Sequence, residues 1–404
     1  MRTLRAMVFL AVAMLGCSRI TDPGPVDDSA LDDPLANAGV VNGMAKTLSR
    51  ALGYVAFTGS AVSREVVAAG SSSASLFGIT LKQRQGLLES GTSEANDHWQ
   101  FAQQARWVAE DGVRRLRVNL GPDFGKSPVG AEGLVYAGFA NRLLGENMCD
   151  AVIDGGPKQP RRVYFERAEA AFSEAITVAV AASNANLERA ARAGRASVRV
   201  GLGNWTGASA DAALIPSSFV YSARYSAQEL DQYNRTFWAN SNQPYRSYSV
   251  IGTFYETYFL TTSDPRTPWA RNAAIPFGSV GSIPWYFQTK YDRREAPMRL
   301  VSGREMRLIV AEAQLRGGDW PAALASINAV RTELGVPPWT ASSAEQTWVA
   351  LKRERGIELW LEGRRLGDLD RWLRDGTPGT VEDMSGRNTC FPIGQTELDS
   401  NVNL

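Results

Sequence analysis

The stretch "AEAQLRGGDWPAALASINAVR", residues 311–331, decides the fold class. Its small and apolar residues recur at helical spacing on both sides of a Gly-Gly-Asp-Trp break. Gly317 and Gly318 can end the first helix with positive φ. Asp319 can cap the next helix, which has Pro321 among its first residues. The stretch therefore predicts two helices joined by a very short turn, with faces formed by Ala311, Leu315, Ala322, Ala323, Ile327 and Val330.

A second copy of this pattern lies 115 residues upstream, in "ASVRVGLGNWTGASADA", residues 196–212. Six positions match when Trp205 is set against Trp320, and "FERAEAAFSEAITVA", from Phe165, resembles the second helix of such a unit. The pattern is typical of tetratricopeptide hairpins, which stack into a superhelix. We therefore expect a mostly α-helical, tetratricopeptide-like superhelix whose hairpins come together from distant parts of the chain. The alternative is chance similarity between two alanine-rich hairpins.

A charged segment follows in "LKRERGIELWLEGRRLGDLDRWLRDG", residues 351–376. Its Glu354, Glu358 and Glu362 lie four residues apart, with arginines between them. Such a row could indicate acid/base chemistry. The simpler interpretation, which we favour, is a charged helix face with intrahelical ion pairs, each of which contributes ~0.3 kcal/mol if it is exposed.

The middle of the chain is rich in aromatic residues. Of the 73 residues from Phe219 to Tyr291, 18 are aromatic and only ten are charged. Turn signals are dense here, and "YRSYSVIGTFYETYFLTT" has strand-like composition. We expect an irregular, partly β insertion over residues 213–297, which interrupts the helical body.

Tyr and Trp side chains combine an apolar face with a polar edge, which suits the C–H face and hydroxyl edge of a sugar ring. Covering ~40 Å² of such a face contributes about 1 kcal/mol. Most of these aromatics must build the insertion's own core, so we expect three or four to reach a ligand. The ligand-binding candidates are Trp238, Tyr245, Tyr248, Trp269, Trp285 and Tyr286.

Composition argues against several other classes. The net charge is +1, so we expect no nucleic-acid partner. The only histidine, His98, is expected near the start of a helix, and the three cysteines lack zinc-site spacing. Neither a phosphate loop nor a dinucleotide fingerprint is present. We therefore expect no catalytic residues, no metal and no cofactor, and thus no enzyme. A glycoside hydrolase with an unmarked carboxylate pair is the weaker alternative.

The N-terminus, "MRTLRAMVFLAVAMLGC", resembles a bacterial lipoprotein signal peptide over residues 1–16, with Cys17 as the lipidated residue. An ordinary signal peptide with an incidental cysteine is the alternative. Ser18, rather than Asp, favours the outer membrane. Residues 17–38 are interpreted as a flexible acidic tether, and residues 39–404 as one domain. An exported chain permits a disulfide between Cys149 and Cys390, which the sequence does not decide.

Three C-terminal segments carry a resemblance to a known family: "KYDRREAPMRLVSGREMRLIVAEAQLRGGDWPAALASINAVRTELG", "LKRERGIELWLEGRRLGDLDRW" and "CFPIGQTELDSNVNL". They resemble the SusD/RagB family of outer-membrane nutrient-binding lipoproteins, although Gly394 and Val402 replace two prolines of the closing motif. "AEGLVYAGFANRLLGENMCDAVI" is similar to the family's first helical hairpin.

The resemblance implies a helical fold with a ligand-binding insertion and no enzymatic activity. It also implies a place at the cell surface, anchored in the membrane by lipid. There the protein would cap a SusC-like TonB-dependent outer-membrane transporter and deliver an oligosaccharide or peptide ligand to it. The alternative function is a tetratricopeptide-type scaffold lipoprotein that holds other proteins during envelope assembly.

Overall fold

A computed structural model describes residues 28–70, 81–241, 243 and 245–404. The predicted signal peptide, Cys17 and the first half of the predicted tether lie outside the described residues.

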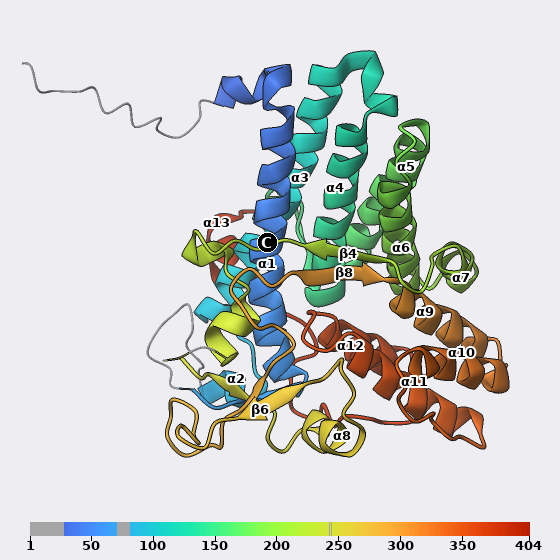
Figure 1. The fold of residues 1–404 in the computed structure, drawn as a ribbon. Helices are drawn as coiled ribbons and strands as arrows, with labels where there is room; N and C mark the ends of the chain where they lie inside the picture. The colour runs from blue at the N-terminus through green and yellow to red at the C-terminus, as the bar shows by residue number, and fades with distance from the viewer. Residues whose placement is uncertain (1–27, 71–80, 242, 244) are drawn as a thin grey trace, which may run out of the picture.

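The body of the protein is helical, as the sequence predicted. Figure 1 shows one group of upright helices and a second group below it. The upright group consists of α1 (Asn37–Val62), α3 (Ser93–Leu120), α4 (Pro128–Asn147), α5 (Arg162–Ala181) and α6 (Ala185–Leu202), followed by α7 (Trp205–Ala213). The lower group consists of α9 (Gly303–Arg316), α10 (Trp320–Glu333), α11 (Ala344–Glu358) and α12 (Arg365–Arg374). The short helices are α2 (Leu81–Gln85), η3 (Gly121–Lys126) and α13 (Gln395–Ser400).

The two predicted hairpins are α6–α7 and α9–α10. Gly203 (φ 75°) and Gly318 (φ 85°) end their first helices in the left-handed conformation, whereas Gly317 keeps a negative φ. Asn204 and Asp319 accept hydrogen bonds from backbone N–H groups at the start of α7 and α10. Because α7 packs against α9, the two hairpins stack although they are far apart in the sequence. The predicted superhelical fold is therefore confirmed.

The N-terminal end of the described chain is more ordered than a tether. Residues 28–36 form the 3₁₀ helices η1 (Asp28–Asp32) and η2 (Pro34–Ala36), and α1 begins at Asn37. The reason is Arg115, which is buried on α3 and forms ion pairs with Asp28 and Asp32. A buried guanidinium needs carboxylate partners, and this segment provides them.

Between α7 and β8 the chain is irregular, in the region of the expected insertion. It contains short helices and strands that pair only in twos, all antiparallel. The strand β4 pairs with β8, and this ribbon crosses in front of the upright helices in Figure 1. The remaining pairs are β1 with β5, β2 with β3, and β6 with β7. The bounds are β1 (Val67–Ala68), β2 (Asp150–Ala151), β3 (Gln159–Pro160), β4 (Val220–Ala223), η4 (Leu230–Gln232), η5 (Thr236–Ser241, a π-helix), β5 (Tyr248–Ser249), α8 (Phe254–Thr262), β6 (Trp269–Arg271), β7 (Tyr286–Gln288) and β8 (Met298–Ser302).

The C-terminal segment is tied to the helical body by a disulfide between Cys149 and Cys390, a pairing the sequence left open. Backbone hydrogen bonds join the same two segments, from Cys149 N to Phe391 O and from Phe391 N to Asn147 O. Cys390 and Phe391 are thereby held beside the end of α4.

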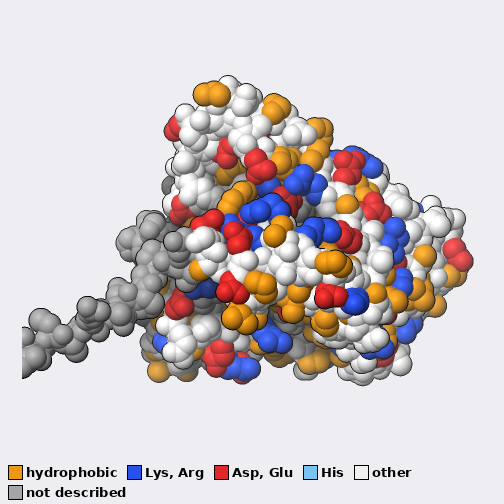
Figure 2. Space-filling view, turned by 90° about the horizontal axis from the view of Figure 1, so that it is seen from above, with side chains coloured by type: hydrophobic (Ala, Val, Ile, Leu, Met, Phe, Trp, Pro, Cys, Tyr) orange, Lys and Arg blue, Asp and Glu red, His pale blue; other side chains and the backbone are white. Residues whose placement is uncertain are grey.

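None of the helices in the described part of the chain is long and apolar enough to cross a membrane. The face seen from above in Figure 2 has acidic, basic and hydrophobic side chains interspersed.

Candidate functional site

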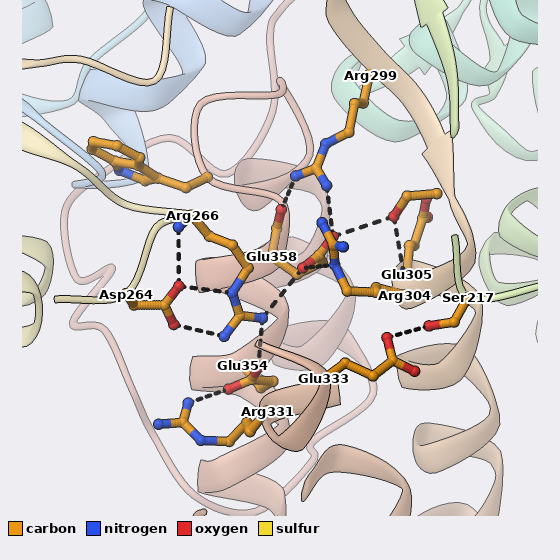
Figure 3. Close-up of polar contacts among 12 residues, drawn as sticks. Ser217, Asp264, Arg266, Arg299, Arg304, Glu305, Arg331, Glu333, Glu354 and Glu358 are labelled. Carbon is orange, nitrogen blue, oxygen red and sulfur yellow. Dashed lines mark hydrogen bonds and ion pairs between the residues drawn. The ribbon is translucent and has the colours of Figure 1, made fainter. Parts of the chain in front are cut away.

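The row of glutamates is buried and pairs with other elements, which corrects the prediction of a charged helix face with intrahelical ion pairs. Glu354, Glu358 and Glu362 have at most 2 % of their surface exposed. The helix also breaks within the segment, because α11 ends at Glu358 and Leu361 adopts a φ of 60°. The carboxylates are neutralised by arginines from other elements rather than by neighbours on the same helix (Figure 3). These arginines are Arg266 of a loop, Arg299 of β8 and Arg304 of α9.

Glu358 illustrates the electrostatics of this network. Its carboxylate pairs with Arg299 at 2.7 Å, with Arg304 at 3.1 Å and with Arg266 at 3.2 Å. Burial by itself would raise the pKa of Glu358, but the three guanidinium groups hold that pKa below its usual range. A carboxyl held ionised by three arginines is unsuited to donate a proton as a general acid. The contacts of Glu358 instead tie α11 to β8, α9 and the loop that carries Arg266.

Two of the six candidate aromatics lie in the core. Tyr248 is fully buried, stacks on Phe57 with ring centroids 4.2 Å apart, and accepts a hydrogen bond from Gln83. Trp285 is 2 % exposed and donates its indole N–H to the backbone oxygen of Asn240 at 3.0 Å. Both side chains are buried. Tyr248 packs the insertion against α1, and Trp285 packs within the insertion.

Trp269 and Tyr286 form a partly exposed stack on the β6–β7 ribbon. Their ring centroids lie 5.0 Å apart with an interplanar angle of 13°, and Phe259 of α8 contacts Trp269 at 6.1 Å. The indole N–H of Trp269 donates to the backbone oxygen of Glu256. The ring is thus fixed in orientation, and part of its surface remains accessible. We call Phe259, Trp269 and Tyr286 the Trp269 stack.

Trp238 and Tyr245 belong to a second partly exposed group. The ring centroid of Trp238 lies 5.0 Å from that of Tyr233, in an edge-on contact, and 5.4 Å from that of Tyr245. The guanidinium of Arg294 lies over both Tyr233 and Trp238, at 4.9 and 4.6 Å from their centroids. Because a cation already covers these two rings, this group offers less free aromatic face than the Trp269 stack.

Sequence reasoning missed a hollow of about 670 Å³ at the base of the insertion. It lies between α4, the start of α6 and β4, and three tyrosines line it: Tyr136, Tyr221 and Tyr225. Tyr136 and Tyr225 are each at most 9 % exposed, so the hollow offers little free ring face. A second groove, of about 390 Å³, lies between α8 and the segment after α10, where Tyr258 stacks on Trp339.

His98 lies near the start of α3, as predicted, and is buried. Burial is the main cause that lowers its pKa to about 3. Its Nε2 is 2.6 Å from the hydroxyl of Thr58. His98 is therefore a neutral packing residue. Within residues 28–70, 81–241, 243 and 245–404, no cluster of three or more metal-ligating side chains occurs.

Comparisons with known proteins agree with this architecture. Residues 287–404 match the model of the SusD family. The predicted resemblance to the SusD/RagB family is confirmed. No curated protein matches the chain significantly in sequence.

Solved structures with the SusD-like fold align with almost the whole chain. A SusD-like carbohydrate binding protein from Bacteroides vulgatus aligns with a TM-score of 0.66 at 14 % identity, covering 92 % of this chain and 97 % of that one. A SusD superfamily protein from Bacteroides fragilis gives a TM-score of 0.68 at 13 % identity, with 92 % and 99 % covered. A laminarin-binding SusD-like protein gives a TM-score of 0.65 at 16 % identity, with 91 % and 98 % covered. At these identities the likeness concerns the fold.

Proposed function

We propose that this SusD-like protein binds a neutral oligosaccharide and that the Trp269 stack provides the main contact. The observation that carries the proposal is a pair of fixed, partly exposed aromatic rings on the irregular insertion. Aromatic faces of this kind pair with the C–H faces of sugars. The match to the SusD family and the laminarin-binding protein of the same fold support a glycan over a peptide.

The proposal extends to the protein's place in the cell. We infer that lipid on Cys17 anchors the chain in the outer membrane at the cell surface. There it captures ligand and passes it to a SusC-like TonB-dependent transporter without chemical change. The chain itself supplies the lipoprotein-like N-terminus, and the transporter is inferred from the family resemblance.

Binding of purified protein to a panel of oligosaccharides by calorimetry tests the ligand. Trp269→Ala should weaken binding about fivefold, because one ring contributes about 1 kcal/mol. The matched control is Leu260→Ala, which removes an exposed apolar side chain from α8, the helix that also carries Phe259. Equal affinity of the Trp269 variant and the control would place the site elsewhere, and release of shorter sugars would instead indicate a hydrolase.

A further inference from the structure

Trp107, on α3, is the exception among the tryptophans. All 11 lie in the described residues, yet only Trp107 falls in the exposed class, with 53 % of its surface accessible. Among those residues, neither a ring nor a cation pairs with the Trp107 indole. A single exposed apolar side chain is ordinary by itself, so what sets Trp107 apart is the groove that it borders.

Trp107 borders a groove of about 310 Å³ on the helical body, outside the insertion. One wall is the face of α3 that carries Gln103, Gln104 and Trp107, which are neighbours at helical spacing. The loop between β2 and β3 contributes Asp154, and Glu397 of α13 completes the rim. Three elements from separate parts of the sequence thus meet around one exposed indole.

The loop wall is pre-formed. Gln103 reaches across from α3 and donates to the backbone oxygen of Val152 at 3.1 Å. Near the C-terminus, Asn401 donates to Gly156 O at 2.9 Å and Asn403 to Gly155 O at 2.7 Å. A ligand would not have to order this wall when it binds, which lowers the entropic cost of binding.

The polar groups of the groove are arranged around Arg106. This guanidinium is 3 % exposed and pairs with Glu110 at 2.8 Å and with Asp154 Oδ1 at 2.7 Å. Asp154 is held by this contact although 57 % of its side chain is exposed. Its second oxygen and the exposed amide of Gln104 have no protein partner among the described residues, so both can bond to a ligand's hydroxyl groups.

We propose that this groove is a second glycan-binding site, in which about one or two sugar units stack on Trp107 and bond to Asp154 and Gln104. Both charges of the Arg106–Asp154 pair are matched within the protein, which favours an uncharged ligand over an anionic one. A stable protein interface would need a wider patch with several aromatic anchors, and this groove offers one. The inference rests on the proposed glycan binding but places a site away from the insertion.

Affinity electrophoresis of the purified protein, in gels that contain laminarin or soluble starch, tests the inference. Four proteins are compared: wild type, Trp107→Ala, the double variant Trp269→Ala/Tyr286→Ala, and the triple variant. On whichever polymer retards the wild type, Trp107→Ala should weaken retardation about fivefold. The double variant should keep residual retardation, which the triple variant loses. The conservative variant Trp107→Phe should restore part of the effect.

The outcomes separate the two proposals. Retardation of the wild type that Trp107→Ala leaves unchanged would overturn the second site and leave the first intact. A wild type retarded by neither polymer would overturn glycan binding at both sites. A Trp107→Ala variant that loses only its association with an outer-membrane barrel would show a protein contact instead and also overturn the second site. Because Trp107 is exposed, matched thermal unfolding of the variant and the wild type serves as the folding control.

Discussion

Removal of the Cys149–Cys390 disulfide should destabilise the protein strongly, because the bond closes a very long loop. The two cysteines are 241 residues apart. In the chain-entropy treatment, a crosslink over such a loop stabilises the folded protein by about 5 kcal/mol, by restricting the unfolded chain. We therefore expect the double variant Cys149→Ala/Cys390→Ala to lose about this much free energy of unfolding.

The folded state should change little in this variant. Cys149 N still donates to Phe391 O at 2.9 Å, and Phe391 N still donates to Asn147 O at 2.8 Å. These backbone bonds hold the C-terminal segment against α4 without the sulfur atoms. The loss should therefore act through the unfolded state, which makes the loop length the source of the predicted magnitude.

Urea unfolding followed by tryptophan fluorescence and far-UV circular dichroism measures the effect. With a denaturant slope of roughly 3 kcal/mol/M, the midpoint should fall by roughly 1.7 M. The wild type with added reductant should shift to the same midpoint as the double variant, and a thiol titration verifies the redox state. A fall of less than roughly 0.3 M, with coincident transitions, would refute the argument that this bond restricts the unfolded chain.

Three further predictions concern buried groups. Glu358→Ala removes a carboxylate shared by three arginines and should cost about 3–5 kcal/mol in urea unfolding, whereas the exposed Glu295→Ala should cost less than about 0.5 kcal/mol. Gly303→Ala should cost about 1–3 kcal/mol and lower the Tm, because its Cβ would lie 1.9 Å from Pro216 O; an unchanged Tm would contradict this. Burial raises the pKa of Glu65 from 4.5 to about 7, so its contribution is complete below pH 4.5 and is lost as pH rises through 7. Glu65→Gln should therefore gain stability relative to the wild type from pH 5 to 8, by up to about 3 kcal/mol, and parallel stability–pH curves would disprove it.

The helical hairpins could be predicted because their signals are local. Gly203 and Gly318 end helices, and Asn204 and Asp319 start the next ones, through contacts within a few residues. The burial of Glu358 could not be predicted in this way. An exposed ion-paired face and a buried network have the same four-residue spacing, and the deciding partner Arg266 lies 92 residues away in the sequence.

The aromatic candidates show a similar limit. Trp285 and Tyr286 are adjacent, yet Trp285 is buried, where it donates to Asn240 O, and Tyr286 is partly exposed, where it stacks on Trp269. Composition does not tell which side faces the core. Trp107, by contrast, had a sequence signal: Trp99, Ala102, Ala109, Val113 and Leu116 form the buried stripe of α3, and Trp107 falls outside it.

The buried glutamates and the exposed stack are parts of one arrangement. Arg266 lies three residues before Trp269 and pairs with Glu354 at 2.6 Å. On the neighbouring strand, Lys290 lies four residues after Tyr286 and pairs with Glu362 at 2.7 Å.

A cation close in sequence to each ring thus ties each strand of the β6–β7 ribbon to the segment that begins with α11. Arg266 does so beside Trp269, and Lys290 does so beside Tyr286. Buried ion pairs add little net stability, since desolvation offsets most of the attraction, but they do restrict position. The positions of Glu354 and Glu362 therefore set where the two anchoring points lie. Under the proposed function, the charged row would act on the ligand only through the placement of the Trp269 stack. A row that looks catalytic in the sequence would then matter for binding without touching a sugar.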